Sequence, residues 1–99
     1  MNDKRIADYL AICDTKARYC RALDTKDWDA YADVFTEDLV LDTTPAGGYM
    51  THGRDEALRM IRGSLEGART AHQVHSPEIR FEGDTAEVTW AMQDRVVWS

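Results

Sequence analysis

Residues 78–98, EIRFEGDTAEVTWAMQDRVVW, decide the fold of this chain. Apolar and polar residues alternate here with a period of two, first at Ile79 and Phe81 and then, beyond a turn at Gly83-Asp84, along a second strand. Every second residue from Ala86 to Trp98 falls on one face of that strand. The stretch therefore predicts two antiparallel strands joined by a turn.

The residues before this stretch follow a helical spacing. Ile6, Leu10, Cys13 and Ala17 share one helix face, which predicts an amphipathic helix over residues 5–23. The other predicted elements are a helix over 28–35, a strand over 39–43, a loop over 44–48, a helix over 54–65 and a strand over 70–75. Helices followed by antiparallel strands indicate an α+β fold, in which the helices pack on one face of a curved sheet.

Composition and charge narrow the class of protein. The chain has 99 residues, of which 43% are hydrophobic and 30% are charged, an ordinary balance for one globular domain. Its 12 basic and 18 acidic residues give a formal net charge of −6, and Lys and Arg do not cluster, so no nucleic-acid partner is expected. No apolar run approaches the roughly 20 residues that span a bilayer, and the amino terminus does not have the pattern of a signal peptide. We expect a cytoplasmic protein without a membrane partner, acting on a small molecule or on another protein.

The spacing of cysteine and histidine predicts neither a disulfide nor a metal site. Cys13 and Cys20 lie seven residues apart in the predicted helix, which separates their Cα atoms by roughly 10 Å, too far for a disulfide. We expect two buried thiols, which fit a reducing compartment. His72 and His75 face opposite sides of a regular strand, so they do not chelate one metal without a bulge. With no glycine-rich phosphate loop in the sequence either, no metal or other cofactor is expected.

The functional signal lies in polar residues at positions where the pattern calls for apolar ones. Asp24 continues the apolar stripe of the first helix at its carboxyl end, where a carboxylate opposes the helix dipole; alternatively, the helix ends earlier and Asp24 begins the turn. His72 shares a strand face with Val74, although a lone inward histidine is more often a hydrogen-bonded core residue than a catalyst. Asp94 lies in mid-strand among apolar residues, where a carboxylate is costly unless it is paired or that end of the strand faces solvent. Tyr19 flanks the helix stripe and by itself means little.

Together these positions place a phenol, two carboxylates and an imidazole on apolar faces of a small domain. A carboxylate that accepts a hydrogen bond from one imidazole nitrogen fixes the tautomer and raises the basicity of the other nitrogen. Such a pair can remove a proton from a carbon next to a carbonyl, while a phenol or a protonated carboxyl group hydrogen-bonds the enolate oxygen or protonates a leaving hydroxide. Trp90 and Met92 would supply apolar walls for a flat or alicyclic ligand.

Three segments resemble a known superfamily. Residues 19–29, YCRALDTKDWD, are similar to the first-helix signature of SnoaL-like domains in the NTF2-like superfamily. Residues 72–79, HQVHSPEI, and residues 90–95, WAMQDR, resemble the branch that includes bacterial bile-acid 7α-dehydratase. Scytalone dehydratase and the hexachlorocyclohexane dehydrochlorinase are more distantly similar. The resemblance runs from about Ile6 to Trp98 and implies a cone-shaped α+β barrel, in which a curved antiparallel sheet wraps the helices and a pocket opens between them.

The resemblance also implies a role for each polar residue. Tyr19 matches an active-site tyrosine, Asp24 the carboxylate that orients the histidine, His72 the general base, and Asp94 a further acid of the active site. His75 matches a residue of the closer branch, and its place on the opposite strand face lets it support the site only indirectly. The candidate substrate-binding residues are Trp90, Met92 and His75.

The chain departs from the family in two respects. Leu23 and Thr43 stand where scytalone dehydratase has tyrosines, so that enzyme's way of positioning water does not transfer. Complete members continue beyond the position of Trp98 with strands that close the cone. We therefore expect a single SnoaL-like domain over residues 1–99 that lacks its last strands, either because it is trimmed, which we favour, or because it completes its sheet by dimerising. A homodimer or higher homo-oligomer is expected, since relatives commonly dimerise through the sheet and Val97 lies at a strand edge.

Two functions follow from these residues. The first is a cofactor-independent lyase or isomerase acting on a small hydrophobic carbonyl compound, such as a steroid, terpenoid or polyketide. His72 would be its base, Asp24 the orienting carboxylate and Tyr19 the group that polarises the carbonyl, while Asp94 would donate to the leaving group or fix the substrate. The second is a non-catalytic module that binds a small apolar ligand or dimerises. Contact between His72 and Asp24 would favour the first.

Overall fold

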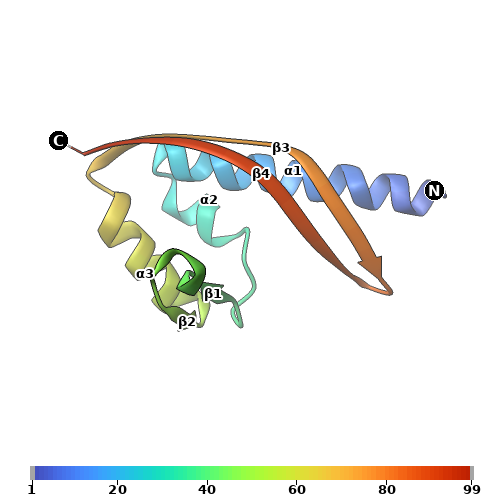
Figure 1. The fold of residues 1–99 in the computed structure, drawn as a ribbon, viewed down its shortest axis with the longest axis horizontal. Helices are drawn as coiled ribbons and strands as arrows, with labels where there is room; N and C mark the ends of the chain where they lie inside the picture. Colours follow the sequence, from blue (N-terminus) through green and yellow to red (C-terminus); the bar gives the residue numbers. More distant parts are fainter. Residues whose placement is uncertain (1, 99) are drawn as a thin grey trace.

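The computed structural model describes residues 2–98, which form an α+β arrangement of helices and antiparallel strand pairs. In chain order the elements are α1 (Asp3–Thr25), α2 (Trp28–Ala32), β1 (Val40–Asp42), the short 3₁₀ helix η1 (Thr44–Ala46), β2 (Met50–His52), α3 (Arg54–Leu65), β3 (Ala68–Glu82) and β4 (Thr85–Trp98). Figure 1 shows the long β3–β4 hairpin arching along α1, with α2, α3 and the β1–β2 pair gathered toward one end. Within residues 2–98 β1 pairs with β2 and β3 with β4, and these sheets do not close into a barrel.

The first helix extends further than the sequence pattern indicates. The Asn2 side chain accepts a hydrogen bond from the backbone N–H of Arg5 and caps the start of α1. At the other end Lys26 adopts a left-handed conformation with φ 60°, and its N–H bonds to the carbonyls of Ala22 and Leu23. Asp24 therefore lies inside the last turn of α1, and the alternative that it begins the following turn is wrong.

The smaller elements differ more from their predicted bounds. The helix over 54–65 is confirmed, whereas the helix predicted over 28–35 ends at Ala32, because the N–H groups of Val34 and Phe35 bond three residues back, in tighter turns. The predicted strand over 39–43 is reduced to β1. The strand β2 has no counterpart in the prediction, since three residues are too short for a period of two to be recognised.

The two strands predicted over 70–75 and 78–82 form one continuous strand, β3. Its pairing with β4 is irregular between His75 and Glu78, where Ser76 and Pro77 oppose the single residue Trp90. Ser76 adopts φ 51° in this bulge. The extra residue reverses the alternation of side chains, so that His72 and Val74 before the bulge and Ile79 and Phe81 after it all lie on the less exposed face of β3.

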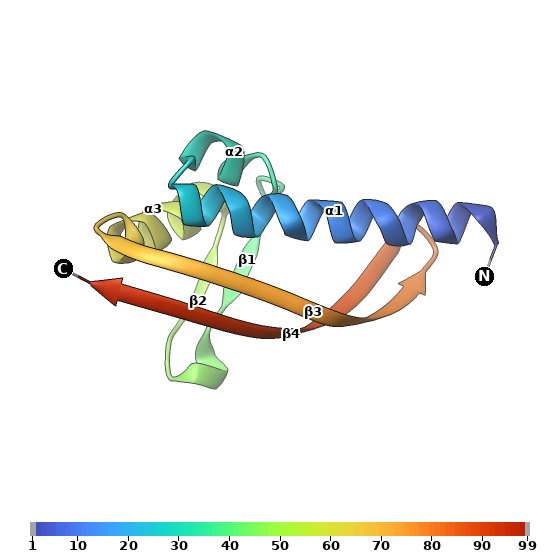
Figure 2. The same ribbon diagram turned by 90° about the horizontal axis from the view of Figure 1, so that it is seen from above.

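The hydrophobic core is concentrated where the end of α1 meets α2 and α3. Ala22, Leu23 and Tyr31 are buried there, and partly buried apolar side chains pack around them: Tyr19, Trp28, Phe35, Leu58, Ile61 and Leu65. Figure 2 shows α1 alongside β3, while α2 and α3 cover only its carboxyl-terminal part. The amino-terminal half of the predicted apolar stripe is therefore open, and Leu10 is 63% exposed.

The two cysteines agree with the sequence prediction in one respect and differ from it in another. Cys13 and Cys20 are free thiols, as predicted. The expectation that both are buried is wrong, because both side chains are only half-buried on α1. Burial still raises the pKa of Cys20, which disfavours its thiolate.

Candidate functional site

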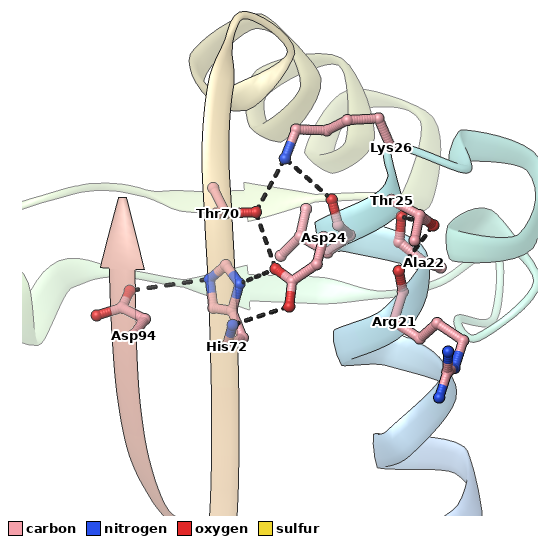
Figure 3. A network of polar contacts seen from close by, with 9 residues as sticks. Arg21, Ala22, Asp24, Thr25, Lys26, Thr70, His72 and Asp94 are labelled. Atoms are coloured by element: carbon pink, nitrogen blue, oxygen red, sulfur yellow. Dashed lines mark hydrogen bonds and ion pairs between the residues drawn. The ribbon is translucent and has the colours of Figure 1, made fainter. Parts of the chain in front are cut away.

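A carboxylate from α1 and an imidazole from β3 meet beneath the end of the helix. His72 Nδ1 lies 2.7 Å from Asp24 Oδ1, and the backbone N–H of His72 donates to Asp24 Oδ2 at 2.8 Å. Figure 3 shows both contacts. The His72 side chain is only 8% exposed. Because an ionised carboxylate accepts hydrogen bonds and does not donate them, Nδ1 carries the proton of the neutral imidazole and Nε2 is then the nitrogen with the lone pair.

The second carboxylate reaches His72 from the neighbouring strand. Asp94 is the direct partner of His72 in the β3–β4 register, and its Oδ2 lies 3.8 Å from His72 Nε2. The imidazole thus stands between two carboxylates, one on each ring nitrogen (Figure 3). Asp94 is more open to solvent than its partner, with a side chain that is 44% exposed.

The hydrogen bonds around Asp24 hold it in its charged form. Burial alone would raise the pKa of this carboxyl, but donors from the His72 ring, the His72 backbone and the Thr70 hydroxyl outweigh burial and lower the pKa below its ordinary value. The Thr70 hydroxyl lies 2.8 Å from Asp24 Oδ1. A charged Asp24 stabilises the imidazolium that forms when His72 takes up a proton.

Two residues of this network are absent from the predicted site. Lys26 Nζ lies 2.9 Å from the Thr70 hydroxyl and 3.2 Å from the carbonyl oxygen of Leu23. Thr70 could have been found from the strand pattern, because it shares a face with His72 two residues away. Lys26 gives no such signal, since only its left-handed backbone turns the side chain back over the end of the helix.

Tyr19 lies apart from the trio of Asp24, His72 and Asp94. Its ring packs against those of Tyr31 and Phe35, with centroids 5.2 and 5.8 Å apart. Among residues 2–98, no hydrogen bond or ion pair joins Tyr19 to any member of the trio. The structure therefore brings three of the four predicted catalytic residues together.

Tyr19 instead lines an open groove of about 1090 Å³ between α1, the segment over residues 34–40 and the β3–β4 hairpin. Its apolar wall is formed by Ile12, Tyr19, Phe35, Leu39, Val88 and Trp90. Lys16 also lines the groove, and its ammonium lies 3.7 Å from the centroid of the Tyr19 ring. Such aromatic walls suit a flat apolar ligand.

A second, shallower hollow of about 680 Å³ contains both His72 and Asp24. His75 lines it as well, although His75 is exposed on the other face of β3 and its Nδ1 lies 3.1 Å from the Ser76 hydroxyl. Met92 is 57% exposed and lines neither hollow. Of the three predicted substrate-binding residues, Trp90 therefore lies in the groove and His75 in the hollow.

Two further observations concern residues 2–98 as a whole. No group of three or more His, Cys, Asp or Glu side chains in this range is placed to hold a metal ion. None of its helices is long and apolar enough to cross a membrane.

Comparison with known proteins finds a matching family and several solved structures with a similar fold. The SnoaL-like domain family matches residues 4–99. A proposed aromatic ring hydroxylase from Novosphingobium aromaticivorans is similar at 33% identity and a TM-score of 0.85, over 93% of this chain and 66% of that one. A proposed scytalone dehydratase from the same organism shares the fold at 24% identity and a TM-score of 0.88, over 100% of this chain and 66% of that one. A LEH-like epoxide hydrolase from Mycobacterium tuberculosis shares it at 14% identity and a TM-score of 0.54, over 85% and 75%. The chain spans slightly less than two thirds of the two Novosphingobium proteins.

Proposed function

The chain belongs to the SnoaL-like domain family of the NTF2-like superfamily, and from that membership we propose that it is a cofactor-independent lyase or isomerase with His72 as its base. The observation that carries the proposal is the 2.7 Å contact between His72 Nδ1 and Asp24 Oδ1, which assigns the single proton of the neutral imidazole to Nδ1. A nearly buried imidazole oriented by a carboxylate on one ring nitrogen is the arrangement of a general base.

In the proposed reaction, Nε2 takes a proton from a carbon next to a carbonyl group, and the electron pair of the broken C–H bond moves onto the carbonyl oxygen. The imidazolium so formed is stabilised by the charged Asp24 carboxylate, which lies 2.7 Å from Nδ1. Return of the proton to another carbon completes an isomerisation. Loss of a hydroxide from the next carbon, with a proton from an acid, completes a dehydration. We assign that acid, or the fixing of the substrate, to Asp94.

The proposed substrate class follows from the groove that Tyr19 and Trp90 line. Its aromatic and aliphatic wall favours a small alicyclic or polycyclic carbonyl compound, such as a steroid, terpenoid or polyketide. We propose that the Tyr19 hydroxyl donates to the carbonyl oxygen of a compound bound there, because Tyr19 and Trp90 line the same groove.

Exchange of carbon-bound hydrogen tests the proposal. We expect the wild-type chain to incorporate deuterium from D₂O next to the carbonyl of cyclic ketones and enones, or to eliminate water from their β-hydroxy derivatives. His72→Ala should slow this by about 10²–10⁴-fold, the usual contribution of a general base. His52→Ala, at an exposed histidine outside the groove and the hollow, is the matched control and should keep the rate. Equal rates in the wild type and His72→Ala would reject the assignment.

A second function, the binding of an apolar ligand without turnover, is favoured by one observation. The groove lined by Tyr19 and Trp90 and the hollow that holds His72 have no lining residue in common. If the groove only binds, a fluorescent apolar probe should bind equally to the wild type and His72→Ala, and neither protein should exchange deuterium. Loss of probe binding in Trp90→Ala would place the ligand in the groove.

A further inference from the structure

A line of polar groups continues the Asp24–His72 pair away from the proposed reaction centre. Lys26 Nζ lies 2.9 Å from the Thr70 hydroxyl oxygen, and that oxygen lies 2.8 Å from Asp24 Oδ1. Figure 3 shows the line running from Lys26 through Thr70 and Asp24 to His72. Lys26, Thr70, Asp24 and His72 are all partly buried, so solvent competes little for these contacts.

The chemistry of the groups fixes the direction of each hydrogen bond. A lysine ammonium has three donors and no acceptor, so it must donate to the Thr70 oxygen. The Thr70 hydroxyl then has its own proton to place elsewhere, and Asp24 Oδ1 is the acceptor within reach. Lys26 therefore turns the Thr70 hydroxyl into a donor toward Asp24.

Asp24 in turn receives three donors. The Thr70 hydroxyl and His72 Nδ1 reach Oδ1, and the His72 backbone N–H reaches Oδ2. A carboxylate surrounded in this way cannot rotate or take up a proton without losing a hydrogen bond. As long as it stays ionised and in place, the proton of neutral His72 must reside on Nδ1.

We propose that Lys26 and Thr70 are positioning residues, which act through Asp24 to hold neutral His72 in the tautomer with Nε2 unprotonated. The reach of Lys26 depends on its backbone, because the left-handed conformation directs the side chain back over the last turn of α1. Glycine adopts φ 60° without the steric cost that lysine meets there, so the lysine is not the best residue for the cap alone. Its ammonium pairs with no carboxylate among residues 2–98 and instead contacts Thr70 and the Leu23 carbonyl.

The tautomer can be read directly by nitrogen NMR on the ¹⁵N-labelled full chain. The chain has three histidines, so His52 and His75 serve as references in the same spectrum. For neutral wild-type His72 we expect Nδ1 with the shift of a protonated nitrogen and Nε2 with that of an unprotonated one. In Thr70→Val and Lys26→Met, the ratio of the Nδ1–H to the Nε2–H form should fall roughly three- to tenfold, the change that one net hydrogen bond produces in an equilibrium.

Matched variants separate positioning from folding. Thr70→Ser and Lys26→Arg keep the donors and should keep the wild-type tautomer. Lys26→Gly removes the ammonium while relieving the backbone, so it should melt no lower than the wild type and still show the tautomer change. Because Lys26 acts through Thr70, the double variant of Lys26→Met and Thr70→Val should show no larger change than Thr70→Val alone.

The outcomes distinguish this proposal from the proposed function on which its catalytic meaning rests. An unchanged His72 tautomer in folded Thr70→Val or in Lys26→Gly overturns it, as does a double variant whose effect is the sum of the two single ones. The NMR measurement needs no substrate. If the His72 tautomer changes in the Lys26 and Thr70 variants but the wild-type chain has no activity, the positioning role is supported and the proposed lyase function is rejected. If activity depends on His72 but the His72 tautomer does not change in Thr70→Val, the proposed lyase function is supported and the positioning role is rejected.

Discussion

Among single residues, Asp24 occupies an unfavourable place and is held there by its neighbours. It lies in the last turn of α1, where the helix dipole disfavours a negative charge. Hydrogen bonds from Thr70 and His72 nevertheless lower its pKa, and the nearby Lys26 ammonium offsets the dipole at the Leu23 carbonyl. The residue therefore links the stability of the fold to the proposed chemistry.

The lowered pKa of Asp24 predicts a pH-dependent stability. Since the folded-state pKa lies below the ordinary value of 3.8, the contribution of the ionised carboxylate is fully present above that value and is lost as the pH falls through the lower, folded-state pKa. Asp24→Asn should be less stable than the wild type at neutral pH, and the difference should shrink below about pH 4. Urea unfolding across this range measures it, and a constant difference would contradict the prediction.

Tyr31 presents the opposite case of a buried group without a partner. Its ring is fully buried against Tyr19, Trp28 and Phe35, and its hydroxyl has no hydrogen-bond partner among residues 2–98. Burial, with the neighbouring Tyr19 phenol, also raises the pKa of this hydroxyl.

Tyr31→Phe should therefore leave the free energy of unfolding unchanged or raise it by up to about 1 kcal/mol, because an unsatisfied polar group is removed. Urea unfolding gives the number, and Tyr31→Leu, which changes the ring itself, should be clearly destabilising. A loss of more than about 1 kcal/mol in Tyr31→Phe would mean that the hydroxyl is hydrogen-bonded after all.

At the level of helices and strands, predictability depends on length. Twelve residues with acids in the first turn were enough to predict α3 with its observed bounds, and the alternation along β4 predicted that strand to within a residue. The short β2 could not be predicted, because its pairing with β1 depends on contacts that close the loop between them, such as the Thr43 N–H to the Tyr49 carbonyl. The bulge in β3 was also missed, since its extra residue has meaning only against the partner strand.

The turn that joins β3 to β4 should be sensitive to a side chain at Gly83. Gly83 adopts φ 57°, with open space where a Cβ atom would lie. Gly83→Ala should therefore destabilise the chain through its backbone alone, by about 1–2 kcal/mol. Gly83→Asn should cost less, because asparagine tolerates this conformation better. Thermal unfolding compares the two, and equal melting temperatures for wild type and Gly83→Ala would refute the idea.

In the molecule as a whole, the open hairpin is the feature with the widest effect. Met92, Val97 and Trp98 are exposed along β4, and β4 has a partner on one side only within residues 2–98. A long strand with an unpaired edge and apolar side chains invites pairing with another strand.

We predict from this edge that the chain forms homodimers or larger homo-oligomers through β4. Light scattering after size exclusion should show a mass that rises with concentration. Val97→Lys should shift it toward the monomer, because a charge at an edge opposes pairing. Ala7→Lys, which adds the same charge at an exposed position of α1 away from β4, is the control for added charge. A wild-type chain that stays monomeric at every concentration would exclude this assembly.

Some features of the proposed site are determined by local sequence pattern, and others are determined by tertiary structure. The helix stripe placed Asp24 on the face toward the sheet, and the strand alternation placed His72 on the face toward the helix, so that pair was within reach of sequence reasoning. The placement of Tyr19 in a separate groove and the role of Lys26 could not be predicted from the sequence, because both depend on how the end of α1 packs and turns. Such features follow from the assembled core rather than from local spacing.

The bulge at Ser76 and Pro77 determines whether an acidic or a basic residue lies opposite His72. Beyond the bulge, toward the turn, the numbers of paired residues sum to 167, as in Ile79 with Val88; on the other side they sum to 166, as in His72 with Asp94. If every residue of β3 were paired one to one with β4, the first rule would hold throughout and His72 would oppose residue 167 − 72 = 95, which is Arg95. The bulge, which leaves one residue of β3 without a partner of its own, thus selects an anion over a cation as the neighbour of the imidazole.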